Sequence, residues 1–188
     1  QLKAKLANNV TDYKNYYITF HDTMEKGLTF NNVSKVTVNG TEVPVKSEDE
    51  PNGYELNSDE HKFDLKLAWD NGEQRLTDQS LNGAEAIVSF SATLNSDAVL
   101  GYEGNVNTAS LEYRCHALDK ESGKIVEDHE ETGEDSVIAF TYKVDVNKVD
   151  EEGKPLSGAA FKLEKILADK TLKEIDRVTV TEGDKFSF

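Results

Sequence analysis

The stretch Thr141–Lys165 reads TYKVDVNKVDEEGKPLSGAAFKLEK and contains the clearest fold signal in the chain. Its two halves, Tyr142–Val149 and Ala160–Lys165, alternate apolar and polar residues, and a segment rich in Gly, Pro and acids (Asp150–Ser157) separates them. Alternation with a period of two on both sides of such a turn is typical of strands in a half-buried sheet. The stretch therefore predicts two strands of such a sheet.

Lys148 lies in the first of these strands, at the same parity as Val144 and Val146. Residues at i, i+2 and i+4 share one strand face, so Lys148 faces inward if the two valines do. A lysine among core side chains is costly unless it is paired, neutralised or chemically consumed. The alternative is a lysine at a strand end whose ammonium reaches water along its apolar stem. The pattern leaves both interpretations open.

Composition excludes several classes of function. The net charge of −15 repels nucleic acid and anionic membrane surfaces, so we expect no nucleic-acid partner. No stretch is long and apolar enough for a transmembrane helix, so we expect no membrane insertion in this fragment. Cys115 is the single cysteine, which rules out an intrachain disulfide and a zinc site built on cysteines. The alternation is already under way at Leu2 and continues to Phe186–Phe188, so we interpret the chain as a fragment of a longer precursor.

Strand signals recur along the whole chain, and a helical period is nearly absent. The dipeptide Asn39-Gly40 follows the alternating segment Ser34–Val38 and is a strong signal for a two-residue hairpin turn. Many short strands with frequent turns predict an all-β protein built of antiparallel sandwiches, with a domain boundary near Tyr142. Other predicted strands are Tyr16–Phe20, Lys62–Trp69, Ala86–Leu94, Ala109–Tyr113 and Ser136–Tyr142, and Asn95–Thr108 is predicted to be a long loop.

Metal and cofactor motifs are missing from the sequence. The histidines His21, His61, His116 and His129 show no HExxH or similar helical spacing, and no glycine-rich phosphate loop occurs. Asp70, Asn71 and Glu73 start a calcium-like pattern that the following residues do not complete. We therefore expect neither a metal nor a cofactor.

Two polar residues occupy predicted core positions. Asp22 has the parity of Ile18 and Phe20, which makes it an inward-facing acid whose pKa burial would raise, or else a residue that caps a turn with Thr23. Asn107 has the parity of the residues that face inward on the strand Ala109–Tyr113, and its alternative is an ordinary loop amide.

Several motifs together resemble one family. Val146–Leu163, VNKVDEEGKPLSGAAFKL, resembles the opening of a Cna B-type domain, through its K-x-D, P-L-x-G-A and F-x-L elements. The segments Asp22–Phe30 (DTMEKGLTF), Phe90–Asn95 (FSATLN) and Asn105–Tyr113 (NVNTASLEY) resemble the Cna A-like domain of Gram-positive pilus backbone subunits. The resemblance implies tandem immunoglobulin-like (Greek-key) β-sandwiches: residues 1–142 form a Cna A-like domain whose N-terminal strand is missing, and residues 143–188 the start of a Cna B-type domain.

The resemblance also implies chemistry. Domains of this family form an isopeptide bond between a lysine amine and an asparagine amide, promoted by a buried acid. Carried over by motif, Asp22 is the promoting acid of the first domain, Asn107 is its amide, and Lys148 is the amine of the second domain. The lysine for Asn107 is expected upstream of Gln1, since Lys3 and Lys5 look outward-facing, and the partners of Lys148 are expected beyond Phe188.

The resemblance finally implies a structural role. It predicts a major pilin: a sortase-assembled subunit of a surface pilus in the cell wall, which reacts once with itself and is not a turnover enzyme. The implied partners are neighbouring pilin subunits, sortase and a host surface ligand. The alternative is a cell-wall-anchored adhesin that is built of the same modules and does not polymerise.

Overall fold

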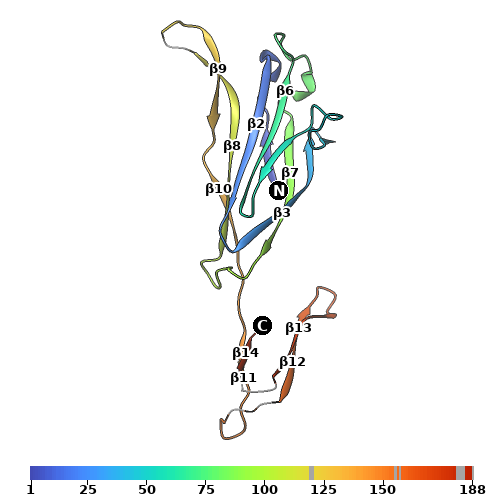
Figure 1. The fold of residues 1–188 in the computed structure, drawn as a ribbon, viewed down its shortest axis with the longest axis vertical. Helices are drawn as coiled ribbons and strands as arrows, with labels where there is room; N and C mark the ends of the chain where they lie inside the picture. The colour runs from blue at the N-terminus through green and yellow to red at the C-terminus, as the bar shows by residue number, and fades with distance from the viewer. Residues whose placement is uncertain (119–120, 155, 157, 181–184, 188) are drawn as a thin grey trace. The chain divides into compact units, whose positions relative to one another are not determined.

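The computed structural model describes residues 1–118, 121–154, 156, 158–180 and 185–187, and it divides the chain into two compact units (Figure 1). The first unit comprises residues 1–99 and 103–140, and the second comprises residues 100–102 and 141–188. No described helix has the length and apolarity needed to cross a membrane. Each unit is described by itself below.

Two antiparallel sheets make up the first unit. One sheet has the strand order β1-β7-β3-β4, and the other has the order β10-β8-β2-β6-β5, with β9 also paired to β8. The strands are β1 (Leu2–Lys5), β2 (Asn15–Met24), β3 (Leu28–Val38), β4 (Thr41–Glu42), β5 (Glu55–Ser58), β6 (Lys62–Asp70), β7 (Glu85–Leu94), β8 (Asn105–Leu118), β9 (Ile125–Glu131) and β10 (Asp135–Ala139). Two short 3-10 turns, η1 (Val10–Asp12) and η2 (Gln79–Leu81), lie between strands. The predicted all-β sandwich class is confirmed.

One hydrophobic core lies between these sheets. It takes inward-facing residues from both, including Phe63 and Leu65 of β6 and Val36 and Val88 of the other sheet, all of them almost fully buried. Strand parity explains the pattern, because alternate residues of each strand point into the space between the sheets. The predicted alternation of Lys62–Trp69 is thus a core face.

Asn39-Gly40 forms the two-residue hairpin turn that the sequence predicts. Both residues adopt positive φ (49° and 79°), and Val38 pairs directly with Thr41 across the turn. A two-residue hairpin needs this left-handed backbone, which asparagine and glycine adopt most readily. The predicted loop Asn95–Thr108 is shorter than expected, because β8 begins at Asn105 and pairs with both β2 and β10.

The second unit consists of two separate antiparallel pairs. Strand β11 (Asp145–Asn147) pairs with β14 (Lys185–Ser187), and β12 (Ala159–Ile166) pairs with β13 (Leu172–Val180). The strand predicted over Tyr142–Val149 is therefore wrong in its extent. Pro155, Ser157 and Phe188, which belong to the predicted turn and final strand, lie outside the described residues.

Val144 does not face a core, so one of the two conditions under which Lys148 was expected to face inward is not met. The side chain of Val144 is 50% exposed, and it precedes the short strand β11. A pair of strands has no second sheet to cover its faces, so most of its apolar side chains stay in contact with water. The second unit, as described, has little buried interior.

Candidate functional site

Asp22 is buried in the core of the first unit. It lies on β2 between β6 and β8, opposite Phe63 on one side and Ala109 on the other, and its residue is only 1% exposed. Its parity with Ile18 and Phe20 places the carboxyl group between the sheets, as the sequence predicted. The alternative reading of Asp22 as an exposed turn cap is thereby excluded.

Asn107 meets Asp22 across β2 and β8. The Nδ2–H group of Asn107 donates a hydrogen bond to Oδ2 of Asp22, with an N···O distance of 2.9 Å. The register explains the contact: Ala109 is directly opposite Asp22, so Asn107 is its diagonal neighbour on the same face. Two residues that are 85 positions apart in sequence thus form one polar pair, and Asn107 is no ordinary loop amide.

Burial changes the acidity of this pair. Removal from water raises the pKa of Asp22 from 3.8 to about 6, since a desolvated carboxylate is disfavoured. The hydrogen bond from Asn107 lowers the same pKa but does not cancel the effect of burial. Near neutral pH, Asp22 can therefore both accept and release a proton.

Two oxygen atoms of the pair have no partner. Oδ1 of Asp22 and Oδ1 of Asn107 are buried and accept no hydrogen bond from the part of the chain that the structure describes. A buried acceptor without a donor destabilises the fold, so such atoms are rare in proteins. A hydrogen-bond donor next to them would satisfy both oxygens, and an amine or ammonium is such a donor.

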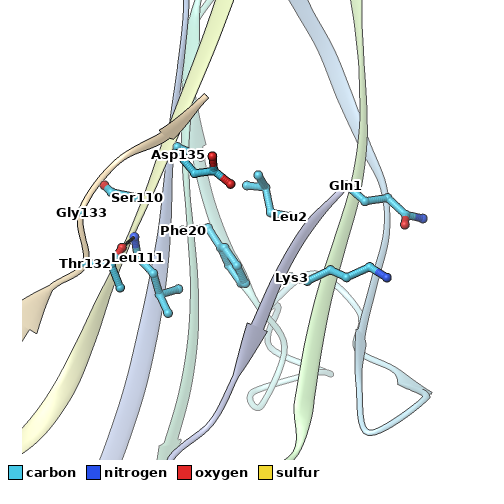
Figure 2. A pocket seen from close by; sticks show the side chains of 10 residues that line it. Gln1, Leu2, Lys3, Phe20, Ser110, Leu111, Thr132, Gly133 and Asp135 are labelled. Carbon is cyan, nitrogen blue, oxygen red and sulfur yellow. Dashed lines mark hydrogen bonds between the residues drawn. The ribbon is translucent and has the colours of Figure 1, made fainter. Parts of the chain in front are cut away.

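A cavity leads from the edge of the sandwich to Asn107. It has a volume of about 150 Å³ and is lined by Gln1, Leu2, Phe90, Asn107, Ala109, Asp135, Ser136 and Val137. A neighbouring cavity of about 370 Å³ shares Gln1, Leu2, Ala109 and Asp135 with it and continues along the same edge, between β1 and β10 (Figure 2). Because a water molecule occupies about 30 Å³ of the liquid, the smaller cavity has room for the end of a lysine side chain.

The lysines nearest to this cavity lie on the wrong face of their strand. Leu2 and Ala4 of β1 are half-buried, whereas Lys3 and Lys5 between them are exposed, as the sequence predicted. In Figure 2 the Lys3 side chain extends away from Phe20 and Leu2. Neither lysine is an evident partner for Asn107.

Lys148 is separate from this pair and belongs to the second unit. It follows β11 directly, is half-buried like Val146, and its backbone carbonyl accepts from the N–H of Leu156. No described residue forms an ion pair or side-chain hydrogen bond with its ammonium group. The structure thus brings Asp22 and Asn107 together and leaves Lys148 without an acid or amide beside it among the described residues.

The search of the sequence missed one cavity residue, Asp135. It begins β10 opposite Ala109 and shares a strand face with Val137 and Ala139, of which Ala139 packs on the core. The predicted strand began one residue later, at Ser136, so the parity of Asp135 was not considered. Among the described residues, no group of three or more His, Cys, Asp or Glu side chains is arranged to hold a metal.

Comparison with known proteins assigns this chain to a family. Residues 1–117 match the family described as Gram-positive pilin backbone subunit 2, Cna-B-like domain. The chain is also 28% identical over 199 residues to the trypsin-resistant surface T6 protein of Streptococcus pyogenes serotype M6, covering 97% of this chain and 34% of that protein. The chain thus spans about a third of the length of this curated relative. Because the matching family carries the Cna-B-like label, the Cna A-like type of the first domain stays a prediction.

Solved structures agree with the fold. The T6 backbone pilin of serotype M6 S. pyogenes aligns with a TM-score of 0.56 at 25% identity, over 97% of this chain and 37% of that one. The full-length major pilin SpaD of Corynebacterium diphtheriae aligns with a TM-score of 0.63 at 22% identity, over 98% and 43%. The pilus 2b backbone protein of group B streptococcus aligns with a TM-score of 0.57 at 15% identity, over 100% and 72%.

Proposed function

The chain belongs to the Gram-positive pilin backbone family, and from this premise we propose that it is part of a covalently polymerised surface pilus whose first domain is tied by an isopeptide bond at Asn107. The observation that carries the proposal is the buried Asp22–Asn107 pair with its two unpartnered oxygens. The amine is a lysine that the family resemblance places upstream of Gln1. It would reach Asn107 through the cavity beside β1.

The reaction joins two side chains and releases ammonia. The neutral lysine nitrogen attacks Cγ of Asn107, a C–N bond forms, and the bond from Cγ to Nδ2 breaks. One proton leaves the lysine nitrogen, and one proton joins Nδ2 as it departs. Asp22 takes up the first and delivers the second, so it ends unchanged.

The hydrogen bond in the structure places Asp22 beside the group that leaves. The Nδ2–H group of Asn107 donates to Oδ2 of Asp22, so the carboxyl group lies next to the nitrogen that must gain a proton as it departs. The raised pKa lets Asp22 exist in both protonation states near neutral pH, as a shuttle requires. Burial also favours the neutral, nucleophilic form of an entering lysine.

Lys148 is proposed as the amine of a second bond, in the second unit. The proposal rests on the family motif and on the half-buried position of Lys148 in register with Val146. The acid and the amide would come from strands that the resemblance places beyond Phe188. In both domains the chemistry occurs once per molecule, so the protein is a structural component and its own substrate.

Mass spectrometry tests the proposal. Each bond releases one ammonia, so the protein isolated from the cells that make it should weigh about 17 Da less per bond than its sequence predicts. An intact mass equal to the sequence mass would overturn the cross-link.

Polymerisation is a separate question from the internal bond. A pilus subunit joined covalently by sortase should appear as a ladder of multimers after boiling in detergent, and the full-length protein should carry a YPK-type lysine motif upstream. A single band and no such motif would favour the alternative, a non-polymerising cell-wall adhesin that binds a host surface ligand.

A further inference from the structure

We propose that Asp135 is a binding residue for the lysine amine: it holds the incoming ammonium at the mouth of the cavity, above Asn107. The inference rests on the proposed cross-link, and it extends the site from a pair to three residues. Asp22 is buried and Asn107 is half-buried at the inner end of the cavity, so neither residue lies where the amine first enters from water.

Strand register places Asp135 beside the reacting amide. On β10, Asp135 pairs with Ala109 and Val137 pairs with Asn107, so Asp135 is the diagonal neighbour of Asn107 on the inward face. Such neighbours are about 7–8 Å apart between their Cα atoms, within reach of one group lying between two side chains. Asp22 is the diagonal neighbour of Asn107 on the opposite side, through β2.

The cavity lining makes this acid distinctive. Among the residues that line the cavity at Asn107, Asp135 is the sole one with an ionisable side chain. Figure 2 shows its carboxylate directed from β10 towards Leu2 of β1, across the entrance that the two cavities share. Strand β10 is at the edge of its sheet, so this carboxylate stays in contact with solvent and can meet an ammonium before that ammonium loses its hydration.

Hydrogen bonding leaves the carboxylate available. One oxygen of Asp135 accepts from the N–H of Ser136 at 2.9 Å, and no other described residue pairs with the side chain. Deeper in the cavity, the unpartnered oxygens of Asn107 and Asp22 offer two further acceptors. A primary ammonium has only donors and matches these acceptors, which a carboxylate or a phosphate would not.

No positively charged side chain competes for the inner cavity, whose described lining holds no lysine or arginine. Lys3 lines the outer cavity, but its side chain lies on the exposed face of β1. The groups around the inner cavity therefore favour a cation, and Asp135 is the one that faces solvent.

Titration with n-butylammonium, a mimic of the lysine side chain, tests the inference on residues 1–188. The Asn107 side-chain amide should show a saturable NMR shift at neutral pH. The substitution Asp135→Asn should weaken the apparent affinity about three- to fivefold, the range of a solvent-exposed ion pair. Added salt should weaken binding to the unchanged chain more than to the Asp135→Asn variant.

Matched controls separate charge from structure. Asp135→Glu should restore the affinity, and Glu134→Gln should not change it, since Glu134 is an exposed acid one residue earlier that lines neither cavity. With n-butanol, which lacks the charge, the unchanged chain and Asp135→Asn should respond alike.

Two results would overturn the inference: equal butylammonium affinity in Asp135→Asn and in the unchanged chain, or no saturable shift at Asn107. Failure of the cross-link would look different, because the protein from its own cells would then keep its full sequence mass while butylammonium still bound through Asp135.

Discussion

The same isopeptide chemistry is predicted for both units, but the residues that would carry it lie in very different surroundings. Asp22 is enclosed between two sheets, with Asn107 bonded to it and a core around it. Lys148 follows a three-residue strand in a two-stranded sheet, and the described residues put no acid or amide beside it. The difference teaches that burial between two sheets, which surrounds Asp22 and not the described part of β11, is what raises the pKa of the acid.

The largest expected difference is in core packing. Phe63→Ala in the first unit should lower the free energy of unfolding by about 3–5 kcal/mol. Phe63 is fully buried, so the substitution leaves a cavity that the surrounding side chains fill only in part. The matched change Ile175→Ala in the second unit should alter stability by less than about 0.5 kcal/mol, since Ile175 is 52% exposed. Urea unfolding followed by circular dichroism measures both, and the fluorescence of Trp69 reports the first unit separately. Equal effects of the two changes would erase the contrast between the units.

Loss of the promoting acid should have the next largest effect. In the protein isolated from its own cells, Asp22→Ala should abolish the first bond and lower stability by about 2–4 kcal/mol, if the isopeptide restrains the unfolded chain as a disulfide does. The fold itself should persist. Asp49→Ala, in an exposed loop, controls for the lost charge and should melt like the unchanged protein. Unchanged melting of Asp22→Ala would mean that this acid has only a local structural role.

A pH titration should show the cost of burying Asp22. Its folded pKa, about 6, exceeds the unfolded value of 3.8, so the folded state binds the proton more tightly between these values. The contribution of this group to the stability of residues 1–188 should therefore be complete below pH 3.8, be lost as the pH rises through about 6, and then level off. Asp22→Asn should remove this fall and gain about 1 kcal/mol at pH 7, with little gain at pH 4. A gain that is the same at both pH values would contradict the raised pKa.

Substitution of Lys148 should have the smallest effect on stability. In residues 1–188, Lys148→Ala should change stability by less than about 0.5 kcal/mol, because its ammonium makes no ion pair with any described residue. Thermal melts of the two chains measure this. A large destabilisation would show that Lys148 already has a partner, and the contrast with Asp22 would fail.

Local pattern was enough to predict the strands and the inward face of Asp22. The alternation of Ile18, Phe20 and Asp22 fixes parity, and Asn39-Gly40 specifies its turn through backbone geometry that few residues adopt. The pairing of Asp22 with Asn107 could not be read from alternation, because it depends on the register between β2 and β8. The family motifs supplied that pairing, and the register explains it.

The errors have one physical cause. Val144 has the same strand parity as Val146, yet its side chain is exposed. Alternation with a period of two shows that a strand has an apolar face, but it does not show whether another sheet covers that face. Asp135 was missed because the predicted strand began at Ser136, and the pairing of Asp135 with Ala109 that extends the strand is a tertiary contact. Burial of a face is a property of tertiary contacts, which the sequence of one strand does not contain.

Peptide mapping tests the central claim most directly. Trypsin cuts after lysine and arginine, so residues 76–114, between Arg75 and Arg114, form one peptide that contains Asn107 and no internal cleavage site. In the protein from its own cells, this peptide should be joined to a lysine-bearing peptide, and the pair should weigh about 17 Da less than the sum of the two. Recovery of residues 76–114 only as the linear peptide, with its full mass, would contradict the account.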